Sequence, residues 1–175
     1  MDIKVVSAVG EGDTKLAAFD NALQRMGVSN YNLIYLSSII PPKSKVTKIG
    51  KYITPPGEFG HRLYVVRADV RSDSVGTAIS AGVGWYQIDD GRGFFVEHSN
   101  QQKMVEEAKT ITVQELHNLT QEQITLTLHD MCNFRHVPFE INKVHTAISS
   151  TEVKDKPVCA LSMAVYQSQA WDSDK

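Results

Sequence analysis

The sequence predicts a single α+β domain in which helices cover sheets. Three observations lead to this fold class. Apolar or alternating segments typical of strands lie near both ends of the chain, an amphipathic helix follows the first of them, and a longer helical pattern lies in the second half. With 175 residues, 42% of them hydrophobic, the chain is long enough to bury a core of its own. We therefore expect residues 1–175 to form one domain.

The first helix is expected shortly after residue 12. Asp13 or Thr14 can cap its start, and Gly27 can end it. Its large apolar residues recur every three or four positions and form one stripe: Leu16, Phe19, Leu23 and Met26. Asp20 falls inside this stripe, so its carboxylate is expected on the core-facing side, where it needs a partner. That partner is either a polar group of the protein or a cationic ligand such as a guanidinium.

The other elements are predicted from alternation, small residues and turn signals. Strands are expected at 3–8, 62–70, 140–149 and 158–166, with a hairpin of 83–88 and 93–97 around Asp89-Asp90-Gly91. Residues 74–82 are rich in small side chains and predict a short helix packed closely against a sheet.

Residues 100–134 predict two further helices. Met104, Val105 and Ala108 form the apolar stripe of the first, and Ile124, Leu126, Leu128 and Met131 form that of the second.

Residues 32–42 combine a strand with an uncommon exit. The strand pattern runs into two adjacent hydroxyls, Ser37 and Ser38, and then into Pro41 and Pro42, which lack backbone donors. The Ser37–Ser38 peptide bond is therefore expected at a strand end, between apolar neighbours. A double serine before a double proline is also an ordinary way to leave a strand, so this spacing alone leaves both interpretations open.

Two further polar residues lie in strands where they could take part in chemistry. Glu97 shares a strand face with Phe95. It is either an exposed strand-end carboxylate or a carboxyl whose pKa burial raises, so that it donates protons near neutral pH. Asn32 begins its strand and either bonds nearby backbone or donates to a developing oxyanion.

Composition excludes several classes of function. The net charge of −2 and the absence of a long apolar run indicate neither a nucleic-acid surface nor a membrane segment. Cys132 and Cys159 lie far apart, and the six histidines show no metal-ligand spacing, so we expect reduced thiols and no metal site. No lysine lies in a recognisable phosphate-binding setting for pyridoxal phosphate. The chain is expected to be soluble and cytoplasmic.

Two segments resemble one known family. Residues 32–42, Asn-Leu-Ile-Tyr-Leu-Ser-Ser-Ile-Ile-Pro-Pro, resemble the self-cleavage site of the pyruvoyl-dependent arginine decarboxylases. Residues 10–23, Gly-Glu-Gly-Asp-Thr-Lys-Leu-Ala-Ala-Phe-Asp-Asn-Ala-Leu, resemble the segment that precedes that site. The similarity is strongest over 9–42 and patchier through residue 97. It implies an αββα sandwich that assembles as a homotrimer or a dimer of trimers, with sites between neighbouring subunits. It also implies an enzyme that converts L-arginine to agmatine and carbon dioxide.

The resemblance also implies roles for individual residues. The chain would cleave itself between Ser37 and Ser38 into residues 1–37 and 38–175, leaving a pyruvoyl group derived from Ser38 as the electron sink. Glu97 would be the general acid, and Asp20 would bind the guanidinium of the substrate. Asn32 is the candidate donor to the oxyanion or the pyruvoyl oxygen. The aliphatic part of arginine would contact four side chains: Leu16, Leu23, Tyr31 and Phe95.

Three alternatives stay open on the sequence alone. The chain could decarboxylate another amino acid, or it could be an uncleaved homologue that acts as a binding or regulatory trimer. It could also be an ordinary α+β domain whose Ser37–Ser38 pair only ends a strand. The presence of Asp20, Asn32 and Glu97 beside the serine pair favours the enzyme, since a degenerate copy would have lost some of these residues.

Overall fold

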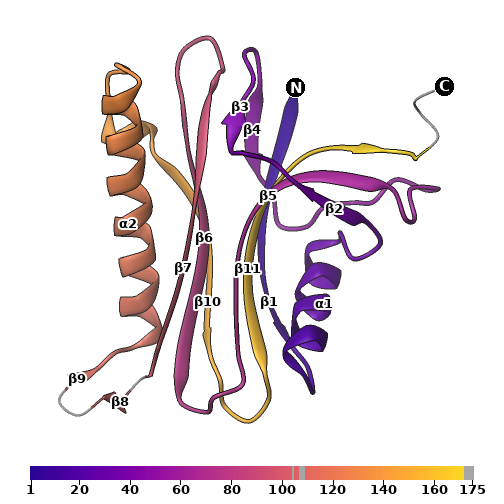
Figure 1. The fold of residues 1–175 in the computed structure, drawn as a ribbon, viewed down its shortest axis with the longest axis vertical. Helices are drawn as coiled ribbons and strands as arrows, with labels where there is room; N and C mark the ends of the chain where they lie inside the picture. The colour runs from indigo at the N-terminus through magenta and orange to yellow at the C-terminus, as the bar shows by residue number, and fades with distance from the viewer. Residues whose placement is uncertain (104, 107–108, 172–175) are drawn as a thin grey trace.

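The computed structural model describes residues 1–103, 105–106 and 109–171. Two sheets lie face to face, and one long helix covers the outer face of each (Figure 1). The layers run from helix α2 (Val113–Phe134) through a four-stranded and a five-stranded sheet to helix α1 (Lys15–Met26). This order confirms the predicted α+β class and the αββα sandwich.

The five-stranded sheet has the order β2-β5-β11-β1-β4. Its members are β1 (Asp2–Glu11), β2 (Asn32–Tyr35), β4 (Lys45–Lys48), β5 (Arg62–Ser72) and β11 (Val158–Gln169). Strand β11 pairs antiparallel with β1 and β5, whereas β2 and β4 run parallel to their neighbours at the two edges. The segment that leads into the serine pair is therefore an edge strand.

The four-stranded sheet has the order β10-β6-β7-β3 and is antiparallel throughout. Its members are β3 (Ile39–Ile40), β6 (Thr77–Gln87), β7 (Gly93–Lys103) and β10 (His145–Glu152). The predicted hairpin is confirmed, with Gly91 in the left-handed region at its turn. A short helical turn (Ile141–Lys143) precedes β10, and β8 (Val105–Glu106) pairs with β9 (Lys109–Thr110).

Helix α1 begins and ends as the local sequence predicts. The Thr14 side chain accepts a hydrogen bond from the backbone of Ala17, and Gly27 ends the helix in the left-handed conformation. The buried face consists of Ala18, Ala22, Leu23 and Met26. A Cβ atom at Gly10 of β1 would lie 2.1 Å from the Ala18 carbonyl oxygen, so the helix packs directly on that strand.

The predicted core-facing stripe of this helix is wrong for two residues. Leu16 is 68% exposed, and Asp20 is exposed and accepts a hydrogen bond of 2.8 Å from the Gln24 side chain. The close approach at Gly10 admits only small side chains, so Ala18 and Ala22 face the sheet together with Leu23 and Met26, whereas Leu16 and Asp20 are turned outward.

The predicted short helix at 74–82 is also wrong, because this stretch leads into strand β6 and forms its first half. Small residues are needed there for a different reason. A Cβ atom at Gly84 would lie 2.0 Å from the Ile124 side chain, and one at Gly82 would lie 2.8 Å from it. The small residues of β6 therefore let α2 pack closely on the strand.

The two helices predicted for 100–134 are one helix, α2, preceded by strand. Strand β7 continues to Lys103, and α2 begins at Val113, where Thr112 and Glu115 form a capping box. Of the predicted first stripe, Met104 and Ala108 lie outside the described residues, and Val105 belongs to β8. Within α2, Ile124 and Leu128 are buried as expected, whereas Leu126 is exposed.

The core has three apolar clusters that follow the layers. The largest fills the space between the sheets, the second lies between α1 and the five-stranded sheet, and the third lies under α2. The two cysteines are free and buried, as expected. Burial and the neighbouring Asp69 carboxylate raise the pKa of the Cys159 thiol to about 12.

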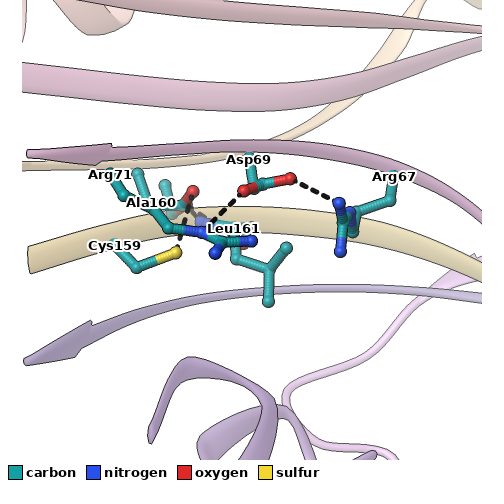
Figure 2. A network of polar contacts seen from close by, with 7 residues as sticks. Arg67, Asp69, Arg71, Cys159, Ala160 and Leu161 are labelled. Atoms are coloured by element: carbon teal, nitrogen blue, oxygen red, sulfur yellow. Dashed lines mark hydrogen bonds and ion pairs between the residues drawn. The ribbon is translucent and has the colours of Figure 1, made fainter. Parts of the chain in front are cut away.

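A charged network on β5 joins α1 and β2 to the sheet. Asp69 lies between two guanidinium groups and pairs with Arg67 at 2.9 Å and Arg71 at 3.0 Å (Figure 2). The Arg71 guanidinium lies 3.8 Å from the ring centre of Phe19 on α1, and that of Arg67 lies 4.5 Å from the ring centre of Tyr35 on β2. These cation–π contacts fix the helix that carries Asp20 and the strand that leads to Ser37.

We predict that Asp69→Asn lowers the free energy of unfolding by about 2 kcal/mol, because two mostly buried guanidinium groups lose their shared counter-charge. Asp2→Asn is the matched control, since Asp2 pairs with Lys4 at the surface, where solvent screens the pair, and its loss should lower the free energy of unfolding much less. Urea denaturation at one protein concentration measures both variants. Equal losses in the two variants would show that the Asp69 network does not hold the fold.

Candidate active site

The serine pair lies where the chain passes from one sheet to the other. The Leu36 N–H donates to the Val65 carbonyl of the five-stranded sheet, at 2.9 Å. Two residues later the Ser38 carbonyl accepts from the Phe95 N–H of the four-stranded sheet, at 2.8 Å. The Ser37–Ser38 peptide bond therefore lies between two strand ladders and within neither of them.

Ser38 has a strained backbone and a partner for its hydroxyl. Its φ of 65° lies in the left-handed region, which costs a residue with a Cβ atom about 1 kcal/mol or more. Its hydroxyl donates to Glu97 Oε1 at 2.7 Å. A strained residue whose side chain meets a carboxylate is a typical feature of a reactive site.

Glu97 lies on β7 with the alternation that the sequence predicts. Phe95 points into the core between the sheets, whereas Phe94 and Val96 lie under α2. Glu97 itself is exposed, so of the two interpretations from sequence the structure corresponds to the exposed strand-end carboxylate. Next to it, His98 bonds Thr127 of α2 at 2.8 Å, and burial lowers the pKa of its imidazole although the Glu97 charge opposes this shift.

Asn32 does not contact the serine pair. Its side-chain amide donates to the Gly60 carbonyl at 2.7 Å, and its backbone N–H donates to the His61 carbonyl at 2.8 Å. The side chain thus fastens the loop before β5 to the start of β2. Of the two interpretations from sequence, this arrangement corresponds to backbone bonding, although the bonded backbone is 28 residues away.

The predicted substrate-binding residues lie in three places. Leu16 and Asp20 lie exposed on α1, outside the five-stranded sheet, and Phe95 lies between the sheets near Ser38. Leu23 and Tyr31 belong to the core under α1, and the Tyr31 hydroxyl donates to Glu58. Burial, followed by this hydrogen bond, raises the pKa of Tyr31. One protomer therefore brings together Ser37, Ser38, Glu97 and Phe95, whereas Asp20 and Leu16 belong to another layer.

Tyr166 is part of this site and was not predicted from the sequence. Its hydroxyl donates to the Ile39 carbonyl at 2.9 Å, and its ring packs edge-on against Phe95 with centroids 5.9 Å apart. Residues from both sheets also form a pocket of about 290 Å³ beneath the serine pair: Met1, Leu36, Ser37, Ile39, Pro41, Tyr64, Tyr166 and Gln167. A tyrosine in an apolar strand gave no local signal of this role.

Within the described part of the chain, no cluster of His, Cys, Asp or Glu side chains could hold a metal ion. In the same residues, no helix is long and apolar enough to cross a membrane.

The family follows from comparison with known proteins. The family model described as pyruvoyl-dependent arginine decarboxylase matches residues 2–170. The chain belongs to the pyruvoyl-dependent arginine decarboxylase family. The relative from Thermococcus sibiricus is 32% identical over 164 residues, which cover 92% of this chain and 91% of the relative. The relative from Thermococcus kodakarensis is 33% identical over 161 residues, covering 91% and 90%. The relative from Methanocaldococcus jannaschii is 35% identical over 82 residues, covering 46% and 48%.

The local geometry fits a pyruvoyl-dependent arginine decarboxylase. Conversion of a serine to a pyruvoyl group needs a hydroxyl next to a peptide bond that strand pairing does not protect. Ser38 meets this need, because its hydroxyl is oriented by Glu97 and the preceding peptide bond lies between the ladders. The carbonyls of residues 38 and 39 are both held by hydrogen bonds, so the new group would stay in place after cleavage.

Proposed function

We propose that this chain is a pyruvoyl-dependent arginine decarboxylase that cleaves itself between Ser37 and Ser38 and then converts L-arginine to agmatine and carbon dioxide. The observation that carries the proposal is the Ser38 hydroxyl, held 2.7 Å from Glu97 at the peptide bond to be cut. Membership of the family over residues 2–170 supports it.

Self-cleavage follows from the chemistry of the serine pair. Ser38 Oγ attacks the Ser37 carbonyl carbon, the peptide C–N bond breaks, and an ester with a free α-amine at residue 38 results. Elimination then breaks the Cβ–Oγ bond, with loss of the α-proton of residue 38 and release of the Ser37 carboxylate. Water then adds to the resulting dehydroalanine, and the nitrogen of residue 38 leaves as ammonia. The products are residues 1–37 and residues 38–175 with a pyruvoyl end.

In turnover, the pyruvoyl group supplies an electron sink for the carbanion that loss of carbon dioxide leaves. Glu97, which lies beside residue 38, is the proposed general acid that delivers a proton to the carbon that has lost the carboxylate. Asp20 binds the guanidinium of arginine and Leu16 contacts its aliphatic part, whereas Phe95 is fully buried in the core between the sheets. The Asn32 amide has a second N–H besides the one bonded to Gly60, but it can donate to an oxyanion only if the side chain moves toward the serine pair.

The active site is proposed to form between subunits. Asp20 lies on α1 outside the five-stranded sheet, whereas Ser38 and Glu97 meet at the edge of the four-stranded sheet (Figure 1). A second copy whose α1 approaches that edge would complete the site, in a trimer or a dimer of trimers. We place the enzyme in the cytoplasm, where its two free, buried thiols are compatible with reducing conditions.

The direct test is decarboxylation by the purified full chain. We expect agmatine and carbon dioxide in equal amounts from L-arginine, and slower release of carbon dioxide from lysine, ornithine and histidine. A faster reaction with one of the other three amino acids would show that this amino acid is the substrate, and the protein would still be a decarboxylase. No release from any of them, by protein that has cleaved itself, would contradict the proposal.

We predict that Asp20→Asn raises the KM for arginine by about 10² while self-cleavage is unchanged, because one charge-assisted pair with the guanidinium is lost. Asp13→Asn is the matched control. Asp13 is an exposed acid just before the same helix, and it pairs with Lys156. Steady-state kinetics measures both variants, and an unchanged KM in Asp20→Asn would exclude Asp20 from the substrate site.

The same variant tests whether sites are shared. At low arginine concentration, Asp20→Asn and Glu97→Gln subunits should each be nearly inactive alone. Refolded together, they should regain activity at about a quarter of the sites, those that combine one intact half from each variant. No gain on mixing would place the whole site within one protomer.

A further inference from the structure

Strand β11 contains an irregularity at a single position. Val165 pairs with Val65 of β5 and Gln167 pairs with Tyr64, so Tyr166 has no partner in the ladder. Such a bulge changes the direction of a side chain and often lies next to an active site. Here the side chain of Tyr166 points into the space between the sheets, where it is only 7% exposed and packs against Phe95.

The hydroxyl of Tyr166 reaches the chain one residue beyond the serine pair. It donates to the Ile39 carbonyl at 2.9 Å, across 127 residues of sequence and from the opposite sheet. The preceding carbonyl, that of Ser38, accepts from the Phe95 N–H at 2.8 Å. Two consecutive carbonyls are thus held from two sheets, and the strained residue 38 immediately precedes the second of them.

The hydroxyl is suited to remain a donor. Burial, together with the charge of the nearby Glu97 carboxylate, raises the pKa of Tyr166 above its ordinary value. The side chain therefore keeps its proton over the pH range in which the protein is folded and working.

We propose that Tyr166 is a positioning residue, whose bond to the Ile39 carbonyl keeps residue 38 in the conformation in which its side chain meets Glu97. This inference rests on the proposed function. The bond matters more after cleavage, because residue 38 then loses its covalent link to Ser37. Its remaining anchors are the backbone bond to Phe95 and the bond between Ile39 and Tyr166.

The test is Tyr166→Phe, which keeps the ring against Phe95 and removes only the hydroxyl. Tyr86→Phe is the matched control, because Tyr86 is also buried and its hydroxyl also donates to a backbone carbonyl, that of Pro138 at 2.8 Å, away from the serine pair. Three values are measured at one temperature: the rate of self-cleavage of freshly made precursor, by intact mass, the KM for arginine, and kcat per pyruvoyl group, with pyruvoyl counted by borohydride reduction.

We expect self-cleavage of Tyr166→Phe to slow roughly tenfold, the equivalent of one hydrogen bond. We expect kcat per pyruvoyl group to fall by a similar factor, with a KM for arginine within about twofold of the wild type. Tyr86→Phe should match the wild type in all three values. A purely structural role would change thermal stability in both variants and leave kcat per pyruvoyl group unchanged.

Two outcomes would overturn the inference. If Tyr166→Phe cleaves and turns over at the wild-type rates, Tyr166 does not position residue 38. If Tyr86→Phe loses as much as Tyr166→Phe, the effect belongs to the loss of any buried tyrosine hydroxyl and not to the bond with Ile39. Failure of the proposed function is distinguishable, because the wild-type chain itself would then form no pyruvoyl group.

Discussion

Ser38→Ala should stay a single chain of 175 residues, whereas we expect the wild-type protein to separate into residues 1–37 and 38–175. Alanine offers no oxygen to attack the Ser37 carbonyl, so neither the ester nor the pyruvoyl group can form. Release of carbon dioxide from arginine should fall to background. Intact mass spectrometry before and after incubation measures the cleavage, and borohydride reduction shows whether the larger fragment carries a carbonyl.

Ser37→Ala is the matched control for this prediction. Ser37 contributes only its backbone carbonyl to cleavage, and its exposed side chain is not consumed, so this variant should still separate into two fragments. An uncut Ser37→Ala chain would show that the Ser37 hydroxyl takes part in cleavage, which attack by Ser38 Oγ on the Ser37 carbonyl does not require. A wild-type chain that stays whole under all conditions would contradict self-cleavage itself.

The same position has a stability signature. Glycine adopts a φ of 65° without strain, so Ser38→Gly should be more stable than Ser38→Ala by about 1 kcal/mol, although both stay uncut. Chemical denaturation of the two variants measures the difference. Equal stability would mean that the left-handed conformation of residue 38 relaxes once its hydroxyl is removed.

Glu97→Gln should lower kcat per pyruvoyl group by about 10² to 10⁴, with a KM for arginine near that of the wild type. The amide oxygen of glutamine can still accept the Ser38 hydroxyl, so the local geometry is kept while the proton donor is lost. Steady-state kinetics, with pyruvoyl counted in each preparation, separates a loss of turnover from a loss of processing.

Glu97→Asp provides the comparison that isolates proton transfer. It keeps the carboxyl group but shortens its reach by one methylene, so its kcat should lie between those of the wild type and Glu97→Gln. A Glu97→Gln enzyme that turns over within about fivefold of the wild type would assign the proton to another group near residue 38.

Local patterns predicted α1 and the β6–β7 hairpin well. Thr14 and Gly27 act as the caps that their residue types favour, and Gly91 adopts the left-handed turn conformation that glycine permits. These features depend on backbone groups a few residues apart, so the sequence contains the whole interaction.

Strand β6 could not be recognised in the same way. All of its residues from Thr77 to Tyr86 are buried, because one face meets the other sheet and the opposite face meets α2. A strand covered on both sides shows no alternation, and its small residues suit a closely packed helix equally well. The end of β7 was missed for the opposite reason, since its polar residues are ordered by pairing with β6 and not by burial.

Local sequence places a serine hydroxyl next to a peptide carbonyl and two prolines after it, because this is a covalent arrangement that no packing can change. Which groups act on that hydroxyl depends on the folded protein. Glu97 is 59 residues from Ser38, and Tyr166 is 127 residues from Ile39, yet strand pairing and one bulge bring each pair within hydrogen-bonding distance. The tertiary structure also turned Asp20 outward, because the alanines of α1 fit against Gly10 and the larger side chains do not. Such contacts join distant segments across two sheets, and no local spacing encodes which of them meet.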